Sequence, residues 1–216
     1  MKGIKQLILS CMLGVGTLTP MQAQQVQGFV HEQSKATDYV WPTDQKVLDK
    51  LDKWQDQKFG VLFHWGLYSV PGIVESWSIC SEDEDWIPRD TTMTYEEYKK
   101  WYFGLIDKFN PVNFNPEQWA DVMQDAGMKY MIFTTKHHDG FCMFDSKYTD
   151  FSIAKGPFAN NPKKDVARYV FDAFRKKEFM IGCYFSKPDW HCPDYWDPAR
   201  ATPDRNPNYD PKKYPK

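Results

Sequence analysis

The sequence predicts an α/β fold: the N-terminal portion, about three β/α units, of a (β/α)8 TIM-type barrel that is incomplete in this chain. Three short apolar runs without alternation, 59–63, 130–135 and 179–185, indicate strands buried on both faces, as in parallel sheets. Helical patterns separate these runs, with short links after the helices and long loops after the strands. That asymmetry is typical of a (β/α)8 barrel, whose usual length is ~250 residues.

The sequence lacks the motifs that two competing folds require. A dinucleotide-binding sheet requires a Gly-x-Gly-x-x-Gly turn, and a phosphate loop requires Gly-x-x-x-x-Gly-Lys-Ser/Thr; neither motif occurs in the sequence. The formal net charge of −2, without a basic block, argues against nucleic acid as a partner. Aromatic residues make up 17% of the chain, and loop tryptophans offer flat apolar platforms for a sugar as well as ordinary packing: Trp65, Trp77, Trp86, Trp190 and Trp196.

The N-terminus has the pattern of a secretory signal peptide over residues 1–23. Two early lysines precede an apolar run at 7–18 that is too short to span a bilayer, and Ala23 offers a cleavage point. A lipoprotein cleavage at Cys11 is the less favoured alternative, because few apolar residues precede it. The mature protein is therefore expected to be periplasmic or secreted, with no transmembrane segment.

Residues 24–58 form a polar lead-in and a helix. The helix is expected over 43–57, with Thr43 as its N-cap. Four residues recur at helical spacing and make one apolar stripe: Val47, Leu48, Leu51 and Trp54.

Three further helices are expected inside the partial barrel domain, 59–216. One covers 95–106 with aromatic anchors. The clearest covers 115–127, where Asn115 is the N-cap, Pro116 the first helical residue and Gly127 the C-terminal glycine. Its core-facing stripe is Trp119, Val122, Met123 and Ala126. A similar Asn161-Pro162 pair is expected to open the last helix, whose buried side is Val166, Ala167, Val170, Phe171 and Phe174.

Polar and ionisable side chains follow each predicted strand. Lys136, His137, His138 and Asp139 follow the second strand, His64 follows the first, and Ser186 to His191 follow the third. Ligands bind at the carboxyl ends of parallel strands, so these residues indicate a site, although structural histidines remain the alternative. Two adjacent histidines can share one pocket only if regular strand geometry ends by about Lys136.

The cysteines do not indicate a metal site. The four that follow the signal peptide are Cys80, Cys142, Cys183 and Cys192, and their spacing fits no zinc pattern. We interpret them as packing residues and leave a Cys183–Cys192 disulfide open. The acidic run 82–85 is interpreted as solvated loop surface. A zinc hydrolase is disfavoured because no His-x-x-x-His pair is present, and neither metal nor cofactor is predicted.

At the strand ends the sequence resembles the α-L-fucosidases of glycoside hydrolase family 29. The run 59–72, Phe-Gly-Val-Leu-Phe-His-Trp-Gly-Leu-Tyr-Ser-Val-Pro-Gly, resembles that family's first barrel strand. Residues 134–141, Thr-Thr-Lys-His-His-Asp-Gly-Phe, resemble its second-strand signature, and Tyr184-Phe185-Ser186 with Asp189-Trp190 resembles the third-strand end. The stretch 189–196 resembles, more weakly, the subgroup that prefers branched fucose linkages.

The resemblance implies removal of terminal α-L-fucose from glycans with retention of configuration, and it implies these sugar-binding residues: His64, Glu75, Trp77, His137, His138 and Tyr184. His64, His137 and His138 would hydrogen-bond the fucose hydroxyls, and Glu75 would bind a further hydroxyl. The sequence departs from the family in one place, because Ser76 separates Glu75 from Trp77.

The family's catalytic carboxylates are expected beyond Lys216, so no catalytic residue is assigned in this chain. Asp139, the tempting substitute, is interpreted as structural. Two hypotheses follow: the chain is a fragment of a secreted exo-α-L-fucosidase and is inactive alone, or it is a non-catalytic fucose-binding module. The second requires three strands to be stable with long unpaired edges, which disfavours it.

Overall fold

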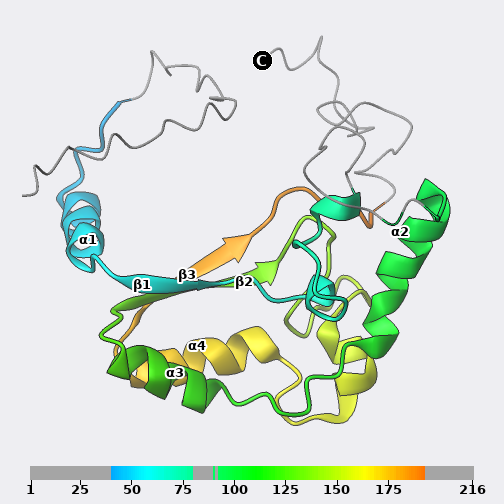
Figure 1. The fold of residues 1–216 in the computed structure, drawn as a ribbon. Helices are drawn as coiled ribbons and strands as arrows, with labels where there is room; N and C mark the ends of the chain where they lie inside the picture. Colours follow the sequence, from blue (N-terminus) through cyan, green and yellow to red (C-terminus); the bar gives the residue numbers. More distant parts are fainter. Residues whose placement is uncertain (1–39, 80–89, 91, 193–216) are drawn as a thin grey trace, which may run out of the picture. The chain divides into compact units, whose positions relative to one another are not determined.

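The structure is a computed structural model that describes residues 40–79, 90 and 92–192. Its centre is a three-stranded parallel sheet in the order β1-β2-β3 (Figure 1). The strands are β1 (Gly60–Phe63), β2 (Tyr130–Lys136) and β3 (Met180–Phe185). The predicted parallel α/β arrangement is confirmed, and each strand boundary lies within one residue of its prediction. The signal peptide, the acidic run 82–85 and the tail after 192 lie outside the described residues.

Burial distinguishes the central strand from the two edge strands. On β2, Met131 and Phe133 are fully buried, as predicted. On β1, Leu62 is 47% exposed, and on β3, Phe185 is 55% exposed. The prediction that all three strands are buried on both faces is therefore wrong for β1 and β3, because these strands form the edges of the sheet and have only one neighbour each.

Two helices connect the strands and lie together on one face of the sheet (Figure 1). The first is α3 (Pro116–Asp125), whose N-cap Asn115 accepts a hydrogen bond from the Gln118 backbone N–H at 3.1 Å, as predicted. Gly127 follows it with a φ of 82°, which confirms the C-terminal signal. The predicted stripe holds only in part, because Val122 and Ala126 are exposed while Ala120 is buried.

The second crossover helix is α4 (Val166–Lys176), and it begins later than predicted. Asp165 is its N-cap and accepts from the Arg168 backbone N–H at 3.3 Å. Asn161 instead accepts from the Lys163 backbone N–H at 2.8 Å, which closes a turn two residues long. The predicted buried side is confirmed for Val166, Ala167, Val170 and Phe174, whereas Phe171 is partly buried.

The helix before the sheet, α1 (Gln45–Asp56), begins one residue later than predicted. Asp44, not Thr43, is the N-cap, because its carboxylate accepts from the Lys46 backbone N–H at 2.8 Å. The apolar stripe of α1 is not part of the core: no residue of α1 is buried, and Trp54 is 52% exposed.

The helix α2 (Tyr95–Phe103) follows the long loop after β1. Thr94 and Glu97 form a capping box at its start, and Tyr98 and Tyr102 are buried as predicted. A 3₁₀ turn, η3 (Gly104–Lys108), extends it. Further 3₁₀ turns include η1 (Leu67–Ser69), η4 (Ile153–Lys155) and η5 (Pro157–Asn160).

The three described cysteines, Cys142, Cys183 and Cys192, are free thiols. The Cys183–Cys192 pairing left open by the sequence is therefore not formed, and Cys183 instead lies 3.3 Å from the Thr135 hydroxyl. Within the described residues, no helix combines the length and apolar character that crossing a bilayer requires.

Candidate functional site

The predicted site residues meet at the carboxyl ends of the three strands. The ring centroids of His64 and His137 lie 5.6 Å apart, and those of His137 and His138 lie 4.4 Å apart. Tyr184 on β3 places its ring 5.4 Å from His64 and 5.9 Å from His137. Residues far apart in sequence thus form one cluster of imidazole and phenol rings, as the parallel arrangement predicts.

A bulge in β2 brings both adjacent histidines to this cluster. Thr134 pairs with Tyr184, but the next pairing joins Lys136 to Phe185, so β2 carries one extra residue at this point. The regular strand then ends at Lys136, which confirms the prediction. Gly140 turns the chain back with a φ of 83°, and its N–H donates to the His137 carbonyl at 3.1 Å.

The loop after β1 contributes Glu75 and Trp77. Glu75 Oε2 lies 3.0 Å from His137 Nε2 and accepts a hydrogen bond from Trp77 Nε1 at 2.9 Å. Glu75 Oε1 lies 3.6 Å from His64 Nε2. Glu75 adopts a φ of 43°, which a non-glycine residue rarely takes, and the extra residue Ser76 turns into the interior. The carboxylate therefore reaches the histidines although Ser76 separates it from Trp77.

Three buried hydroxyls hold the three histidines, and the sequence did not reveal them. Ser76 Oγ lies 2.5 Å from His137 Nδ1, Thr134 Oγ1 lies 2.9 Å from His64 Nδ1, and Ser186 Oγ lies 2.5 Å from His138 Nδ1. Each pair is separated by 48 to 70 positions in the chain. No local spacing pattern could signal such contacts, although Ser186 belongs to the third-strand motif.

Burial keeps the central histidines neutral. It lowers the pKa of His137 to about 3, and the neighbouring His138, His64 and Lys136 add to this effect. Burial, with Lys136 and His64, lowers the pKa of His138 to about 4. Burial and the Glu75 carboxylate raise the pKa of Tyr184, so its phenol keeps its proton. At neutral pH the rings of His137, His138 and Tyr184 are therefore uncharged.

Aromatic side chains line the site beside His138. The Trp77 ring centroid lies 4.7 Å from that of His138, and the Trp190 centroid lies 5.0 Å from it. Trp190 is buried, and the sequence had singled it out both as a loop aromatic and as part of the third-strand motif. Tyr68, which the sequence did not single out, packs its ring 5.7 Å from His137. Its buried hydroxyl has no hydrogen-bond partner among the described residues.

Asp139 points away from the cluster. It is buried, accepts a hydrogen bond from the Tyr102 hydroxyl at 2.8 Å and accepts another from the Phe141 N–H at 3.1 Å. Burial raises the pKa of its carboxyl to about 6. These contacts tie the histidine loop to α2, which supports the structural interpretation of Asp139.

The geometry of the cluster bears on two other chemistries, metal binding and catalysis by a serine nucleophile. Within the described part of the chain, His64, Glu75 and His137 form one group that could hold a metal ion, since one ligand atom from each lies within 4.8 Å of the others. The sequence spacing did not signal this group. Ser76, His137 and Glu75 also resemble a nucleophile, base and carboxylate, but the Ser76 side chain is 0% exposed and cannot meet a substrate.

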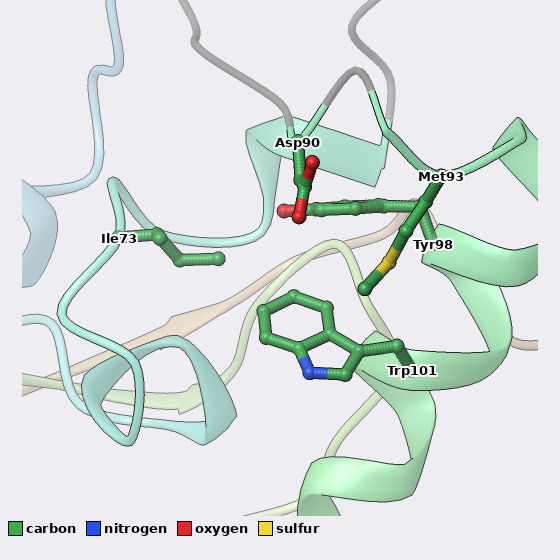
Figure 2. Close-up of a pocket in the computed structure, with 5 residues that line it drawn as sticks. All are labelled: Ile73, Asp90, Met93, Tyr98 and Trp101. Carbon is green, nitrogen blue, oxygen red and sulfur yellow. The ribbon is translucent and has the colours of Figure 1, made fainter.

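Two cavities among the described residues lie away from the histidine cluster. A cavity of about 200 Å³ lies beside α2, lined by Ile73, Asp90, Met93, Tyr98 and Trp101 (Figure 2). A larger one of about 610 Å³ has Lys136, Cys142 and Asp189 among its lining residues. None of the six predicted site residues lines either cavity. We give the histidine cluster more weight, because its chemistry converges at the strand ends.

The fold and the cluster define a class: a parallel α/β domain with a polar, aromatic-walled site at the carboxyl ends of its strands. The family model described as Alpha-L-fucosidase matches residues 26–216. The chain belongs to the α-L-fucosidase family.

Individual relatives support this family assignment. Human plasma α-L-fucosidase is 33% identical over 67% of this chain and 31% of its own length. Among solved structures, α-L-fucosidase isoenzyme 1 from Paenibacillus thiaminolyticus has a TM-score of 0.56 and 36% identity, covering 78% of this chain and 35% of that one. A family 29 enzyme from Bacteroides thetaiotaomicron, trapped as a covalent intermediate with 2-fluoro-fucosyl fluoride, has a TM-score of 0.53 and 32% identity, covering 68% and 32%. The chain thus spans about a third of the length of these relatives.

Proposed function

We propose that this chain is the sugar-binding, N-terminal part of an exo-acting α-L-fucosidase that removes terminal α-L-fucose from glycans. The observation that carries the proposal is the convergence of His64, His137, His138, Glu75 and Tyr184 at the strand ends of a chain in this family. The substrate is a fucosylated glycan or oligosaccharide.

The composition of the cluster suits a neutral sugar. Imidazole nitrogens and a carboxylate offer several acceptors and donors for ring hydroxyls, and hydrogen bonds to charged groups are the stronger ones. Trp77, which is partly buried, supplies a flat apolar surface for a C–H face of the sugar, and Trp190 packs against its ring. His64, Glu75, Trp77, His137, His138 and Tyr184 are the proposed substrate-binding residues.

The proposed mechanism is retaining. Retaining hydrolysis uses two carboxylates about 5–5.5 Å apart, one as nucleophile and one as acid/base. The covalent intermediate of the Bacteroides thetaiotaomicron relative supports this mechanism for the family member at hand. We assign neither carboxylate to a residue of this chain, because Glu75 is engaged with the histidines and Asp139 is buried behind them. The 216-residue chain alone is therefore proposed to be inactive.

The proposed architecture is the first three β/α units of a (β/α)8 barrel, within a domain that covers residues 59–216 and follows the lead-in at 24–58. The exposed Leu62 and Phe185 on the two edge strands support it, since further strands would cover them. The proposed location is the periplasm or outside the cell, and the signal-peptide pattern of residues 1–23 supports it.

The test uses what we call the completed barrel: this chain extended past Lys216 by the continuation of its reading frame. If the frame stops, the extension is the corresponding C-terminal part of the Paenibacillus thiaminolyticus enzyme. We expect it to hydrolyse an aryl α-L-fucoside and to leave an aryl β-D-galactoside intact. Proton NMR during the reaction should show α-L-fucose as the first product.

Three results are informative. First formation of the β-anomer would contradict the retaining mechanism. Binding of L-fucose without hydrolysis would favour the alternative of a non-catalytic fucose-binding module. Neither binding nor hydrolysis by a folded completed barrel would overturn the proposed function.

A further inference from the structure

The three hydroxyls behind the histidines carry an inference that rests on the proposed function and deepens it. Ser76, Thr134 and Ser186 are 0%, 1% and 4% exposed, respectively. A buried hydroxyl must find a hydrogen-bond partner inside the protein. Each of these three meets the Nδ1 atom of a different histidine, which leaves the Nε2 edge of that ring for the site.

The hydrogen bonds of Ser186 fix the tautomer of His138. The Ser186 hydroxyl donates its one proton to the Pro188 carbonyl at 3.3 Å. Its oxygen can then only accept from His138 Nδ1, which lies 2.5 Å away, so that nitrogen carries the ring proton. A neutral imidazole has a single N–H, so His138 Nε2 is a bare acceptor.

His137 has the opposite arrangement. Its Nε2 lies 3.0 Å from Glu75 Oε2, and a bare nitrogen lone pair so close to a carboxylate would be repelled. The ring proton therefore lies on Nε2, and Nδ1 accepts from the Ser76 hydroxyl. Glu75 is held in place by its further hydrogen bond from Trp77 Nε1.

We propose that Ser76 and Ser186 are positioning residues that hold the adjacent His137 and His138 in opposite tautomers, and that this pattern selects a neutral polyol. The bare Nε2 of His138 requires a donor from the ligand, and the remaining oxygen of the Glu75 carboxylate can accept one. A sugar hydroxyl supplies one, whereas the carboxylate of a uronic acid cannot. The pattern thus favours a neutral sugar over an anionic sugar of similar size.

Nitrogen-15 NMR measures the tautomers directly. The chain has five histidines, so the two-bond ¹H–¹⁵N correlations can be assigned with single His→Gln variants. The spectra are recorded for the 216-residue chain and for the completed barrel, so that the test does not depend on how the shorter chain folds. We expect the ring proton of His138 on Nδ1 and that of His137 on Nε2.

Variants connect the tautomers to binding. Ser186→Ala should move His138 toward the Nε2–H tautomer and weaken L-fucose binding by the completed barrel about tenfold. Ser186→Thr keeps a hydroxyl and should restore both. Ser146→Ala is the matched control, because Ser146 is a buried serine whose hydroxyl accepts from the Tyr148 backbone N–H away from the site. L-Galacturonate, which carries a carboxylate in place of the C6 methyl group of L-fucose, should bind at least tenfold more weakly than L-fucose.

Each outcome is decisive. An Nε2–H tautomer for His138 in the unmodified protein, or a Ser186→Ala variant with unchanged tautomer and affinity, would overturn the inference. The predicted tautomers together with no L-fucose binding would contradict the proposed function but leave the tautomer assignment standing. L-Fucose binding with the other tautomers would support the proposed function and overturn the tautomer assignment.

Discussion

His137 and His138 are neighbours in sequence, yet their surroundings differ. His137 is 3% exposed and lies between Ser76 and Glu75, whereas His138 is partly exposed and lies between Ser186 and the tryptophans Trp77 and Trp190. A buried polar contact contributes about 1 kcal/mol or more, because its loss leaves a desolvated partner unpaired. Each ring should therefore matter separately for binding the sugar.

Substitution of either histidine should reduce activity. In the completed barrel, His137→Ala and His138→Ala should each lower kcat/KM for an aryl α-L-fucoside about tenfold or more, which corresponds to about 1.4 kcal/mol. His191→Ala is the control, since His191 stacks on Phe151 at a ring-centroid distance of 4.0 Å and contacts none of the proposed sugar-binding residues in any described interaction. Full activity of either site variant would leave that histidine as a packing residue.

Acid should destabilise the fold through these histidines. Their folded pKa values, about 3 and about 4, lie below the ordinary value of 6.5, so the unfolded chain takes up protons first as the pH falls. The stability that they contribute is complete above about pH 6.5 and is lost toward pH 4. Asp139 acts in the opposite direction, because its folded pKa of about 6 exceeds 3.8 and the folded state takes up its proton first.

The Asp139→Asn variant separates the two effects. Removing the opposing contribution, about 3 kcal/mol for a shift of about two units, should make the loss of stability between pH 6 and 4 steeper. His138→Gln should make it shallower. Urea unfolding at a series of pH values measures both slopes. A profile that Asp139→Asn leaves unchanged would show that this carboxyl titrates normally in the folded state.

At the scale of elements, the turn after β2 is the most constrained part of the site. Gly140 has a φ of 83°, and a Cβ atom at this position would overlap the Asp189 carboxylate. That carboxylate cannot easily move, because it is held by Lys136 Nζ at 3.4 Å and by the Cys192 N–H at 3.1 Å. The glycine is therefore required both by its backbone conformation and by its neighbour.

Gly140→Ala should lower the free energy of unfolding by about 2 kcal/mol or more. The left-handed conformation alone costs an alanine about 1–2 kcal/mol, and the overlap with Asp189 adds to it. Gly72→Ala is a matched control, since Gly72 has a φ of 72° but no atom within 4 Å of the added Cβ. Thermal unfolding of the completed barrel measures both. Equal losses for the two variants would show that the Asp189 contact is unimportant.

The elements also show what sequence patterns can and cannot predict. Asn115 capped α3 as expected, whereas the same Asn-Pro pair at Asn161 formed only a turn and Asp165 capped α4. Both side chains can satisfy a backbone N–H two or three residues ahead, so local sequence does not decide between cap and turn. The strand-end residues of the site were predictable, because the carboxyl ends of parallel strands lie side by side at the same end of the sheet.

The hydroxyls of Ser76, Thr134 and Ser186 were not predictable in this way. Their contacts with the histidines depend on the β2 bulge and on the backbone of the β1 loop, including the unusual φ of Glu75. Both features arise from tertiary packing, and no periodic pattern in the sequence encodes them.

At the scale of the whole molecule, the described sheet ends in two unpaired edges. Phe59 and Leu62 at β1 are 51% and 47% exposed, and Phe185 at the end of β3 is 55% exposed. Such apolar edges are covered in stable domains, and in a closed barrel the remaining strands would pair with them. The chain therefore supplies one side of a site whose other side is proposed to come from those strands.

The central proposal is that the described residues of this chain hold the sugar without supplying the two carboxylates that retaining hydrolysis requires. Its most direct test is turnover of an aryl α-L-fucoside by the 216-residue chain and by the completed barrel, at equal concentration and in the same buffer. We expect no turnover above background for the shorter chain. We expect hydrolysis by the completed barrel, and His137→Ala should lower its kcat/KM about tenfold or more. Comparable turnover by the shorter chain would contradict this proposal.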